Sequence, residues 1–406
     1  MTCIELFDRN FADNICSCLA LSPERVILLG KEKGISKHAE KYTEIFKARG
    51  YNTEFSSMTL DRNDMSKIID TLSKLVEQYD DCTFDLTGGD DQYLVAVGII
   101  LERYKGRVQG HCINTRNGEM TDCDCDGKVS GKITTPSLSF EENVKLYGGK
   151  IKNVPSLTKW KIDSDFLCDL NKMWRICLND NTAWNIQTSY LNVIAMSSFS
   201  DNGLDIQCSM KKIRTFESNS SSNEKFDVNF IKKLYSANII TDYFYDKKQL
   251  NFRFKNAQIK QCLTKAGQVL ELKVYSTAKL LQENGISFYN DAKTGVIIEW
   301  DDNGNEKRND DVLNEIDVAL MKGMIPVFIS CKNGRFDSNE LFKLASVAEQ
   351  FGGKYAKKIV ITTSKDCAET MKPRAKELKI GIVYIHSNMS NEKFEKKLKG
   401  LWSNNG

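Results

Sequence analysis

Strand-like and helix-like segments alternate through the first quarter of the chain, and this alternation constrains the fold more than any other feature. The pattern predicts strands at 25–30 (RVILLG), 52–60 and 82–89, and helices at 36–50, 66–79 and 90–104. Such alternation favours an α/β domain with a parallel sheet, in which ligands bind at the carboxyl ends of the strands. Two such ends are marked, one by Gly30 and Lys31, the other by Thr87, Gly88 and Gly89.

The loop at residues 87–89 is suited to binding a phosphate. Backbone N–H groups at a helix start attract anions, although a tight strand-to-helix turn would also select two glycines. Asp90 and Asp91 follow directly, and they either cap the next helix or contact ribose hydroxyls. Lys31 and Lys33, after the first predicted strand, are placed to offset this negative charge.

The segment from about 155 to 258 is less regular. Residues 217–227 (ESNSSSNEKFD) are polar, which indicates a loop. A helix predicted at 228–240 precedes an alternation of aromatic and polar residues around a Lys-Lys turn, which is typical of a β-hairpin. A helix followed by a hairpin is winged-helix-like, so this segment either contacts DNA or serves as a scaffold.

Charged residues on two strands of the last third suggest metal-assisted hydrolysis. We expect strands at 314–321 (NEIDVALM) and 325–332 (IPVFISCK), with Glu315 and Asp317 on the first and Lys332 ending the second. Carboxylates bind Mg²⁺ or Mn²⁺, and a Lys ammonium stabilises charge that develops on a phosphate. This chemistry needs no histidine, and the chain has only 3 His. A cross-strand salt bridge would explain the same residues more simply.

Longer runs of sequence favour the hydrolytic interpretation. NEIDVALMKGMIPVFISCKNG, followed by ELFKLASVAEQFGGKYAKKIVITT, resembles CRISPR-associated nucleases that join an N-terminal CARF domain to a C-terminal PD-(D/E)XK restriction-endonuclease-like domain. LTKAGQVLELKVY (263–275) resembles the first helix of that nuclease domain. LALSPERVILLGKEK and FDLTGGDDQYLVAVG resemble the two ligand-binding strand ends of the CARF domain.

The resemblance implies an α/β architecture in three parts. These are a Rossmann-like CARF domain at 1–150, a winged-helix-like connector at 151–258 and a nuclease domain at 259–406. It implies a homodimer, activated by a cyclic oligoadenylate (cyclic tetra-adenylate is expected), in type III CRISPR antiviral defence. The implied substrates are DNA, single-stranded or nicked duplex, and RNA, with Mn²⁺ or Mg²⁺ as the metal. The residues expected to contact the activator are Gly30, Lys31, Thr87, Gly88, Gly89 and Asp90.

Three residues match the nuclease motif of this family. Asp317 corresponds to its metal-binding Asp, Lys332 to its catalytic Lys, and Glu271 to the acid of its first helix. Cys331 stands where the family uses a backbone carbonyl on the metal. The resemblance therefore implies metal-assisted phosphodiester hydrolysis at these positions.

Ser330 departs from the motif, which has Asp or Glu two residues before the Lys. Serine supplies no negative charge, so another acid has to compensate, although its hydroxyl can still bind water or phosphate. Glu315 shares a strand face with Asp317, while Glu340 lies at a helix start where Asp337-x-x-Glu340 also matches a capping box. Two alternative functions remain: a ligand-gated DNA-binding regulator with an inactive nuclease-like domain, and a ring nuclease that degrades its own ligand.

Composition agrees with a polyanion-binding C-terminal part. The formal net charge is −5 over residues 1–150 and +8 over the remainder. The 13 Cys include no C-x-x-C pair, which disfavours a zinc ribbon and favours reduced thiols in a cytoplasmic protein, with Cys123 and Cys125 as a weak metal candidate. We expect no signal peptide, no membrane span and no membrane partner.

Overall fold

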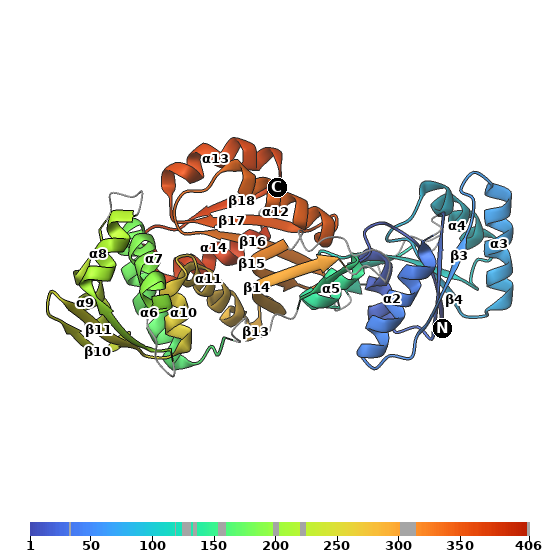
Figure 1. Ribbon diagram of the computed structural model, residues 1–406. Coiled ribbons are helices and arrows are strands. Elements are labelled where there is room, and N and C mark those ends of the chain that lie inside the picture. The colour runs from blue at the N-terminus through green and yellow to red at the C-terminus, as the bar shows by residue number, and fades with distance from the viewer. Residues whose placement is uncertain are drawn as a thin grey trace.

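The computed structural model describes residues 1–31, 34–117, 119–123, 131–132, 136–152, 160–197, 203–219, 225–300 and 314–403. Lys33 and Cys125 lie outside the described residues. Three bodies lie in a row, and the last part of the chain (orange and red) forms the central one, between the first part and the middle part (Figure 1). We call them the N-terminal, central and far bodies.

A seven-stranded sheet in the order β3-β2-β1-β4-β5-β6-β7 forms the N-terminal body. Its strands are β1 (Thr2–Leu6), β2 (Arg25–Gly30), β3 (Glu54–Thr59), β4 (Cys82–Asp85), β5 (Gln109–Asn114), β6 (Glu119–Asp122) and β7 (Gly131–Lys132). Its helices are α1 (Asp13–Leu21), α2 (Ile35–Ala48), α3 (Met65–Gln78) and α4 (Asp91–Arg103). β1 to β5 pair in parallel, so the predicted parallel sheet with crossover helices is confirmed.

The sequence pattern does not predict β1, although β1 lies between β2 and β4 in the sheet. Its sequence TCIEL contains Glu5, a charged residue that nevertheless is 0% exposed, and this residue interrupts the hydrophobic pattern. Side chains along β1 alternate between the two faces of the sheet. Cys3 packs with α1 and α2, and Ile4 packs with α3 and α4.

The central body is built on a six-stranded sheet in the order β18-β17-β16-β15-β14-β8. Its strands are β8 (Gly149–Ile151), β14 (Asp291–Trp300), β15 (Asn314–Lys322), β16 (Ile325–Lys332), β17 (Lys357–Thr362) and β18 (Ile380–Tyr384), and a small hairpin adds β12 (Gln282–Glu283) and β13 (Ile286–Ser287). Its helices are α5 (Phe140–Leu146), α11 (Gln268–Leu280), α12 (Ser338–Gly352), α13 (Lys365–Glu377) and α14 (Asn391–Ser403). The two strands predicted to carry the site are confirmed as β15 and β16. The predicted domain boundary at 150 falls within β8, which pairs with β14.

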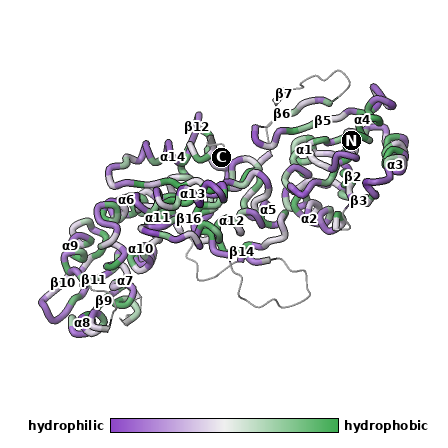
Figure 2. Tube along the Cα trace, turned by 90° about the horizontal axis from the view of Figure 1, so that it is seen from above, coloured by the Kyte–Doolittle hydropathy of each residue, from purple (hydrophilic) through white to green (hydrophobic). Residues whose placement is uncertain are grey.

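The far body combines helices with a three-stranded sheet, β10-β11-β9. Its elements are α6 (Ser164–Asn179), α7 (Asn181–Ser197), β9 (Asp205–Ser209), α8 (Met210–Asn219), α9 (Val228–Ser236), β10 (Ile240–Tyr245), β11 (Gln249–Phe254) and α10 (Ala257–Thr264). The predicted helix and hairpin are confirmed as α9 and β10–β11, and the hairpin end of the molecule is hydrophilic (Figure 2). Among the described residues, no helix has both the length and the hydrophobicity of a membrane span.

Two hydrophobic clusters cross the boundaries between the bodies. One joins α2 of the N-terminal body, through α5, to the α12 face of the central sheet, and includes Phe46, Phe140 and Phe328. The other joins the far body to α11 and the opposite face of that sheet, and includes Trp184 and Ile329. Continuous apolar packing of this kind holds the bodies against one another rather than leaving them on flexible linkers.

A polar contact joins the N-terminal and central bodies beside Gly353. Asn10 Oδ1 accepts hydrogen bonds from the Tyr147 hydroxyl (2.9 Å) and from the Lys354 backbone N–H (3.3 Å). Gly353 has a φ of 69°, and a Cβ at this position would collide with the Tyr147 hydroxyl. Both the backbone conformation and the space therefore require glycine.

We expect Gly353→Ala to lower the free energy of unfolding by about 2–4 kcal/mol, because it adds overpacking to left-handed backbone strain. Gly285→Ala is the matched control, since Gly285 has a φ of 77° but nothing near its Cβ position. The control should cost only about 1–2 kcal/mol. Urea unfolding of the full chain measures both values, and equal losses would contradict a tight contact at Gly353.

Candidate active site

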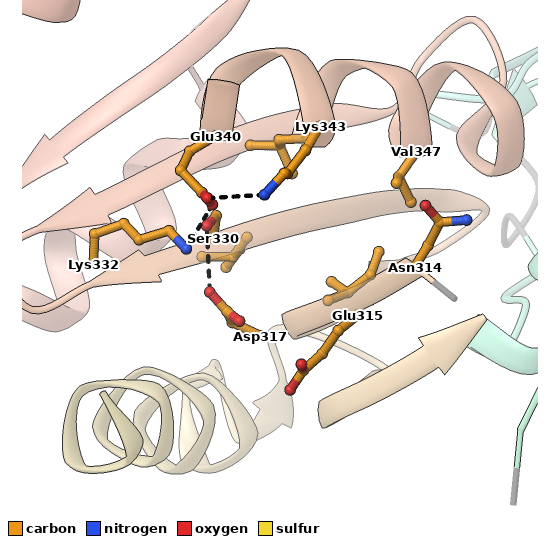
Figure 3. Close-up of a pocket in the computed structure, with 11 residues that line it drawn as sticks. Asn314, Glu315, Asp317, Ser330, Lys332, Glu340, Lys343 and Val347 are labelled. Carbon is orange, nitrogen blue, oxygen red and sulfur yellow. Dashed lines mark hydrogen bonds and ion pairs between the residues drawn. The ribbon is translucent and has the colours of Figure 1, made fainter. Parts of the chain in front are cut away.

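The pairing of β15 with β16 places Asp317 beside Ser330. Asp317 Oδ2 accepts a hydrogen bond from the Cys331 backbone N–H (2.6 Å) and another from the Ser330 hydroxyl (3.3 Å). The carboxylate is thus held by two donors of the neighbouring strand, and Figure 3 shows its contact with Ser330. The residue that departs from the family motif therefore contacts the predicted metal-binding acid directly.

Lys332, Glu340 and Lys343 form a chain of ion pairs in the same cavity, whose volume is about 340 Å³ (Figure 3). Lys332 Nζ lies 2.6 Å from Glu340 Oε2, and Lys343 Nζ lies 3.3 Å from Glu340 Oε1. Asp337 caps α12 by accepting a hydrogen bond from the Asn339 backbone N–H. The Glu340 side chain points to Lys332, so it does not serve the capping box that the sequence also permits.

Glu271 lies on α11 and does not line this cavity, although it is close enough to Asp317 for their charges to interact. Glu271 is only 5% exposed, and it accepts a hydrogen bond from Gln268 Nε2 (3.0 Å). Lys265 Nζ lies 3.9 Å from Glu271 Oε1 and 3.5 Å from Glu315 Oε1. The structure thus brings Glu315 toward Glu271, whereas Glu340 is the acid beside Lys332.

Burial and mutual repulsion oppose ionisation of the acids around Asp317. Burial, with the negative charges of Asp317 and Glu315, raises the pKa of Glu271 to about 7. Burial also raises the pKa of Asp317, although the Cys331 N–H favours its ionised form. For Glu340 burial acts in the same direction, but the hydrogen bond with Lys332 outweighs it and lowers the pKa. A cation placed between these acids would offset their mutual repulsion and favour their ionised forms.

The donor set fits a hard divalent cation that retains some of its water. Asp317 and Glu271 provide two carboxylates, and Mg²⁺ sites commonly use one or two because the ion keeps several waters. In the described part of the chain, no three acidic, thiol or imidazole groups of this site come within 4.8 Å of one another, so the protein does not enclose an ion completely. The Cys331 thiol is buried, which raises its pKa far above the ordinary value. The thiol is therefore a poor ligand, and a role for the Cys331 backbone carbonyl stays a prediction.

The predicted activator loop borders a second cavity, of about 200 Å³, lined by Phe7, Asp8, Arg9, Lys31, Gly89, Asp90 and Tyr93. Two of its three amides already have acceptors. The Thr87 N–H donates to Asp85 Oδ1 (2.8 Å), and the Gly89 N–H donates to Asp8 Oδ2 (3.3 Å). A Cβ on Gly88 would lie 2.7 Å from Asp8 Cβ, which explains this glycine by close approach. An anionic ligand therefore has to compete with Asp8 for the loop.

Asp90 occupies the N-cap position of α4 but makes no capping hydrogen bond with its side chain. Its carboxylate instead binds Lys31 Nζ (2.7 Å) and Arg62 Nη1 (3.3 Å). Gly30 ends β2 immediately before Lys31. The predicted charge compensation by Lys31 is therefore confirmed, and helix capping by the Asp90 side chain is not.

Sequence reasoning missed several charged residues of these sites, among them Asp8, Arg62 and Lys265. Asp8 follows β1, so recognising that strand would have placed Asp8 at a strand end, where ligand sites gather. Arg62 lies in the connection between β3 and α3, and Lys265 lies at the end of α10. Neither position carries a pattern that separates it from ordinary surface charge.

Comparisons with known proteins identify the fold. No family profile matches the sequence, and no curated protein matches it. Protein VC1899 from Vibrio cholerae aligns with 99% of this chain and 98% of its own length, at 16% identity and a TM-score of 0.73. Can2 from Sulfobacillus thermosulfidooxidans, solved in complex with cyclic tetra-adenylate, aligns with 99% of this chain and 97% of its own, at 16% identity and a TM-score of 0.63. This chain therefore shares the overall fold of both structures along nearly its whole length.

We expect the stability of the protein to depend on pH through Glu271. Its pKa is raised from 4.5 to about 7 on folding, so its stabilising contribution is complete below pH 4.5 and is lost as the pH rises through 7. Glu271→Gln should remove up to about 3 kcal/mol of pH dependence between about pH 5 and pH 8. Urea unfolding in EDTA measures this, with Glu369→Gln, an exposed acid on α13 that does not act on Glu271, as the control. Curves for Glu271→Gln and wild type that run parallel across this range would contradict the shift.

Proposed function

We propose that this protein is a metal-dependent nuclease that a cyclic oligoadenylate activates in type III CRISPR antiviral defence. The observation that carries the proposal is the meeting of Asp317, Lys332 and Glu340 in one cavity, with the buried Glu271 nearby. The proposed substrates are DNA, single-stranded or nicked duplex, and RNA. Mn²⁺ or Mg²⁺ is the proposed metal.

The activator is proposed to be cyclic tetra-adenylate. Support comes from the overall likeness to the Can2 structure, which contains that molecule, and from the loop cavity at the strand ends of the N-terminal sheet. A two-fold symmetric ring suits the interface of a two-fold symmetric homodimer, in which both subunits present the same surface. Binding would favour the arrangement of the dimer that admits nucleic acid to the central body.

Asp317 and Glu271 would hold the metal, with the Cys331 backbone carbonyl as the proposed third ligand. A bound divalent cation supplies a polarised phosphate and a water of lowered pKa. Ser330 donates to Asp317 Oδ2 and so orients the carboxylate, although it adds no charge. The acid that the family motif has at this position is proposed to be replaced by one from another element.

Lys332 is proposed to stabilise negative charge on the phosphate as the bond to the leaving oxygen breaks. Burial opposes its charged form, but the hydrogen bond with Glu340 and the charge of Asp317 raise its pKa overall, so it is an ammonium at neutral pH. Glu340 therefore acts as a positioning residue for Lys332. It also supplies the negative charge that Ser330 cannot.

A ligand-gated DNA-binding regulator is the second candidate, and Ser330 is the observation that favours it. In that function the far body, with α9 and the β10–β11 hairpin, would bind duplex DNA while the central body stays inactive. Sequence-specific binding of duplex DNA, with no cleavage in the presence of Mn²⁺ and cyclic tetra-adenylate, would identify it.

We expect Lys332→Ala to reduce cleavage of plasmid and single-stranded DNA by at least about 100-fold, because it removes transition-state charge stabilisation. Lys343→Ala is the matched control, since Lys343 also contacts Glu340 but its side chain is 72% exposed. Its effect should stay within about threefold. The assay compares rates with Mn²⁺, with and without cyclic tetra-adenylate. If Lys332→Ala and wild type cleave equally, the catalytic assignment is wrong.

A metal titration should distinguish the two acids that are candidates to replace the motif carboxylate. We expect Glu340→Gln to raise the Mn²⁺ concentration for half-maximal cleavage by roughly tenfold or more, because it removes a negative charge from the cavity and leaves the positive charge of Lys332 uncompensated near the metal. Glu315→Gln should change it by less than about threefold, since Glu315 is exposed and paired with Lys265. The opposite order of effects would assign the compensating role to Glu315.

A further inference from the structure

A row of buried polar side chains crosses the sheet of the N-terminal body, apart from both cavities described above. Glu5 on β1 pairs in register with Asp85 on β4, and Asp85 pairs with His111 on β5. Paired residues point to the same face of a sheet. Glu5 and Asp85 are each 0% exposed, and His111 is 4% exposed. Two carboxyl groups and an imidazole are therefore placed side by side away from water.

Each of these three side chains has a polar atom that receives no hydrogen bond from an amide, hydroxyl or ammonium group of the described residues, although the carboxyl groups of Glu5 and Asp85 lie close enough to share a proton. The atoms are Glu5 Oε1, Asp85 Oδ2 and His111 Nε2, and the last two lie 3.9 Å apart. The second polar atom of each side chain is engaged: Ser17 Oγ donates to Glu5 Oε2 (3.3 Å), Thr83 Oγ1 lies 3.0 Å from His111 Nδ1, and Asp85 Oδ1 accepts from Thr87. A buried polar atom left without a partner costs about 1–3 kcal/mol. Three such atoms on neighbouring strands indicate a ligand that satisfies them.

Two buried thiols adjoin the row. Cys3 lies on the same face of β1 as Glu5, and Cys18 comes from α1, which covers that face. A ligand atom from each of Cys3, Glu5 and Cys18 lies within 4.8 Å of the other two, and this is the one such group among the described residues. Cys18 Sγ lies 4.0 Å from Glu5 Oε2. Ligands of a tetrahedral zinc ion are separated by roughly 3.4–3.8 Å, so only small shifts would close the site.

We propose that this cluster binds one thiophilic divalent cation of the zinc class. Cys3, Cys18 and Glu5 provide three ligands. Asp85 lies outside that group of three, and its Oδ2, 3.9 Å from His111 Nε2, would have to move toward the ion to become the fourth. Thiolates and carboxylates in tetrahedral arrangement are a zinc donor set, and thiolates disfavour Mg²⁺ and Ca²⁺. The cation neutralises acids that would otherwise be buried without a positive charge beside them.

The site would be structural, and it would act on the activator loop through Asp85, whose Oδ1 accepts hydrogen bonds from both the N–H and the hydroxyl of Thr87. Asp85 Oδ1 accepts the Thr87 N–H, so a metal ligand at Asp85 Oδ2 would fix the residue that holds the loop. Residues that ligate a metal are commonly held in place by hydrogen bonds from neighbouring groups, as Asp85 is here by Thr87. The proposal does not depend on nuclease activity, because it concerns only the interior of the N-terminal body.

The test is the metal content of the full-length protein. After expression in zinc-supplemented medium and dialysis against a chelating resin, wild type should retain about one zinc ion per chain by elemental mass spectrometry. Cys18→Ser should lose most of it. Cys16→Ser is the matched control, because Cys16 is buried on the same helix but is not among the proposed ligands. Protein produced with cobalt should show thiolate-to-cobalt absorption in wild type and Cys16→Ser, and should lack it in Cys18→Ser.

Four results would overturn the proposal. The first is wild type that holds neither zinc nor cobalt, and the second is equal zinc retention by Cys18→Ser and wild type. The third is equal loss of zinc in Cys16→Ser and Cys18→Ser. The fourth is a disulfide between Cys3 and Cys18 in the alkylated protein. If Cys18→Ser does not fold, Glu5→Gln preserves the side-chain shape and should reduce zinc retention and shift the cobalt spectrum. Full retention by Glu5→Gln, with an unchanged cobalt spectrum, would exclude the carboxylate ligand.

Discussion

Burial of both faces of the β15–β16 pair is the constraint on which the rest of the structure depends. One face packs under α12 and shares its hydrophobic cluster with the N-terminal body, and the other packs on α11 and shares its cluster with the far body. Charges at the end of this strand pair are therefore partly removed from water. Electrostatic interactions are stronger in this less polar surrounding than in water. The same packing that holds three bodies together also raises the pKa of Glu271 and of Asp317.

The acid beside Lys332 comes from a helix. In the motif that the sequence resembles, the carboxylate precedes the Lys on the same strand, whereas Glu340 lies on α12. A strand residue is fixed by the backbone hydrogen bonds between neighbouring strands. Glu340 is fixed instead by its helix, which packs on the sheet through Leu341 and Leu344. The geometry of the site thus rests on a helix–sheet contact, and changes in the apolar face of α12 would reach the chemistry.

Most of the fold could be predicted from the sequence, because the periodicity of strands such as β2 and β16 and of helices such as α3 is clear. β1 could not, since a buried Glu5 breaks its pattern and its burial depends on residues far along the chain. The convergence of Asp317 and Lys332 on one cavity was predictable from their places on adjacent strands. The contact of Glu340 with Lys332 was not, because a helix-capping role matched the local sequence equally well and only the crossing of α12 over β16 decides between them.

One short loop after β1 makes two separate contacts, one with the loop at residues 87–89 and one with the central body. Asp8 Oδ1 accepts the backbone N–H of Asn10 (2.7 Å), while Asp8 Oδ2 accepts the N–H of Gly89 and Asn10 accepts from Tyr147 and Lys354. The border of the loop cavity and the contact with the central body are therefore built from the same few atoms. In evolutionary terms the two features are not independent: a substitution in this loop that reshapes the cavity also alters how the N-terminal body rests on the central body. Lineages that change one are expected to carry compensating changes around Gly353.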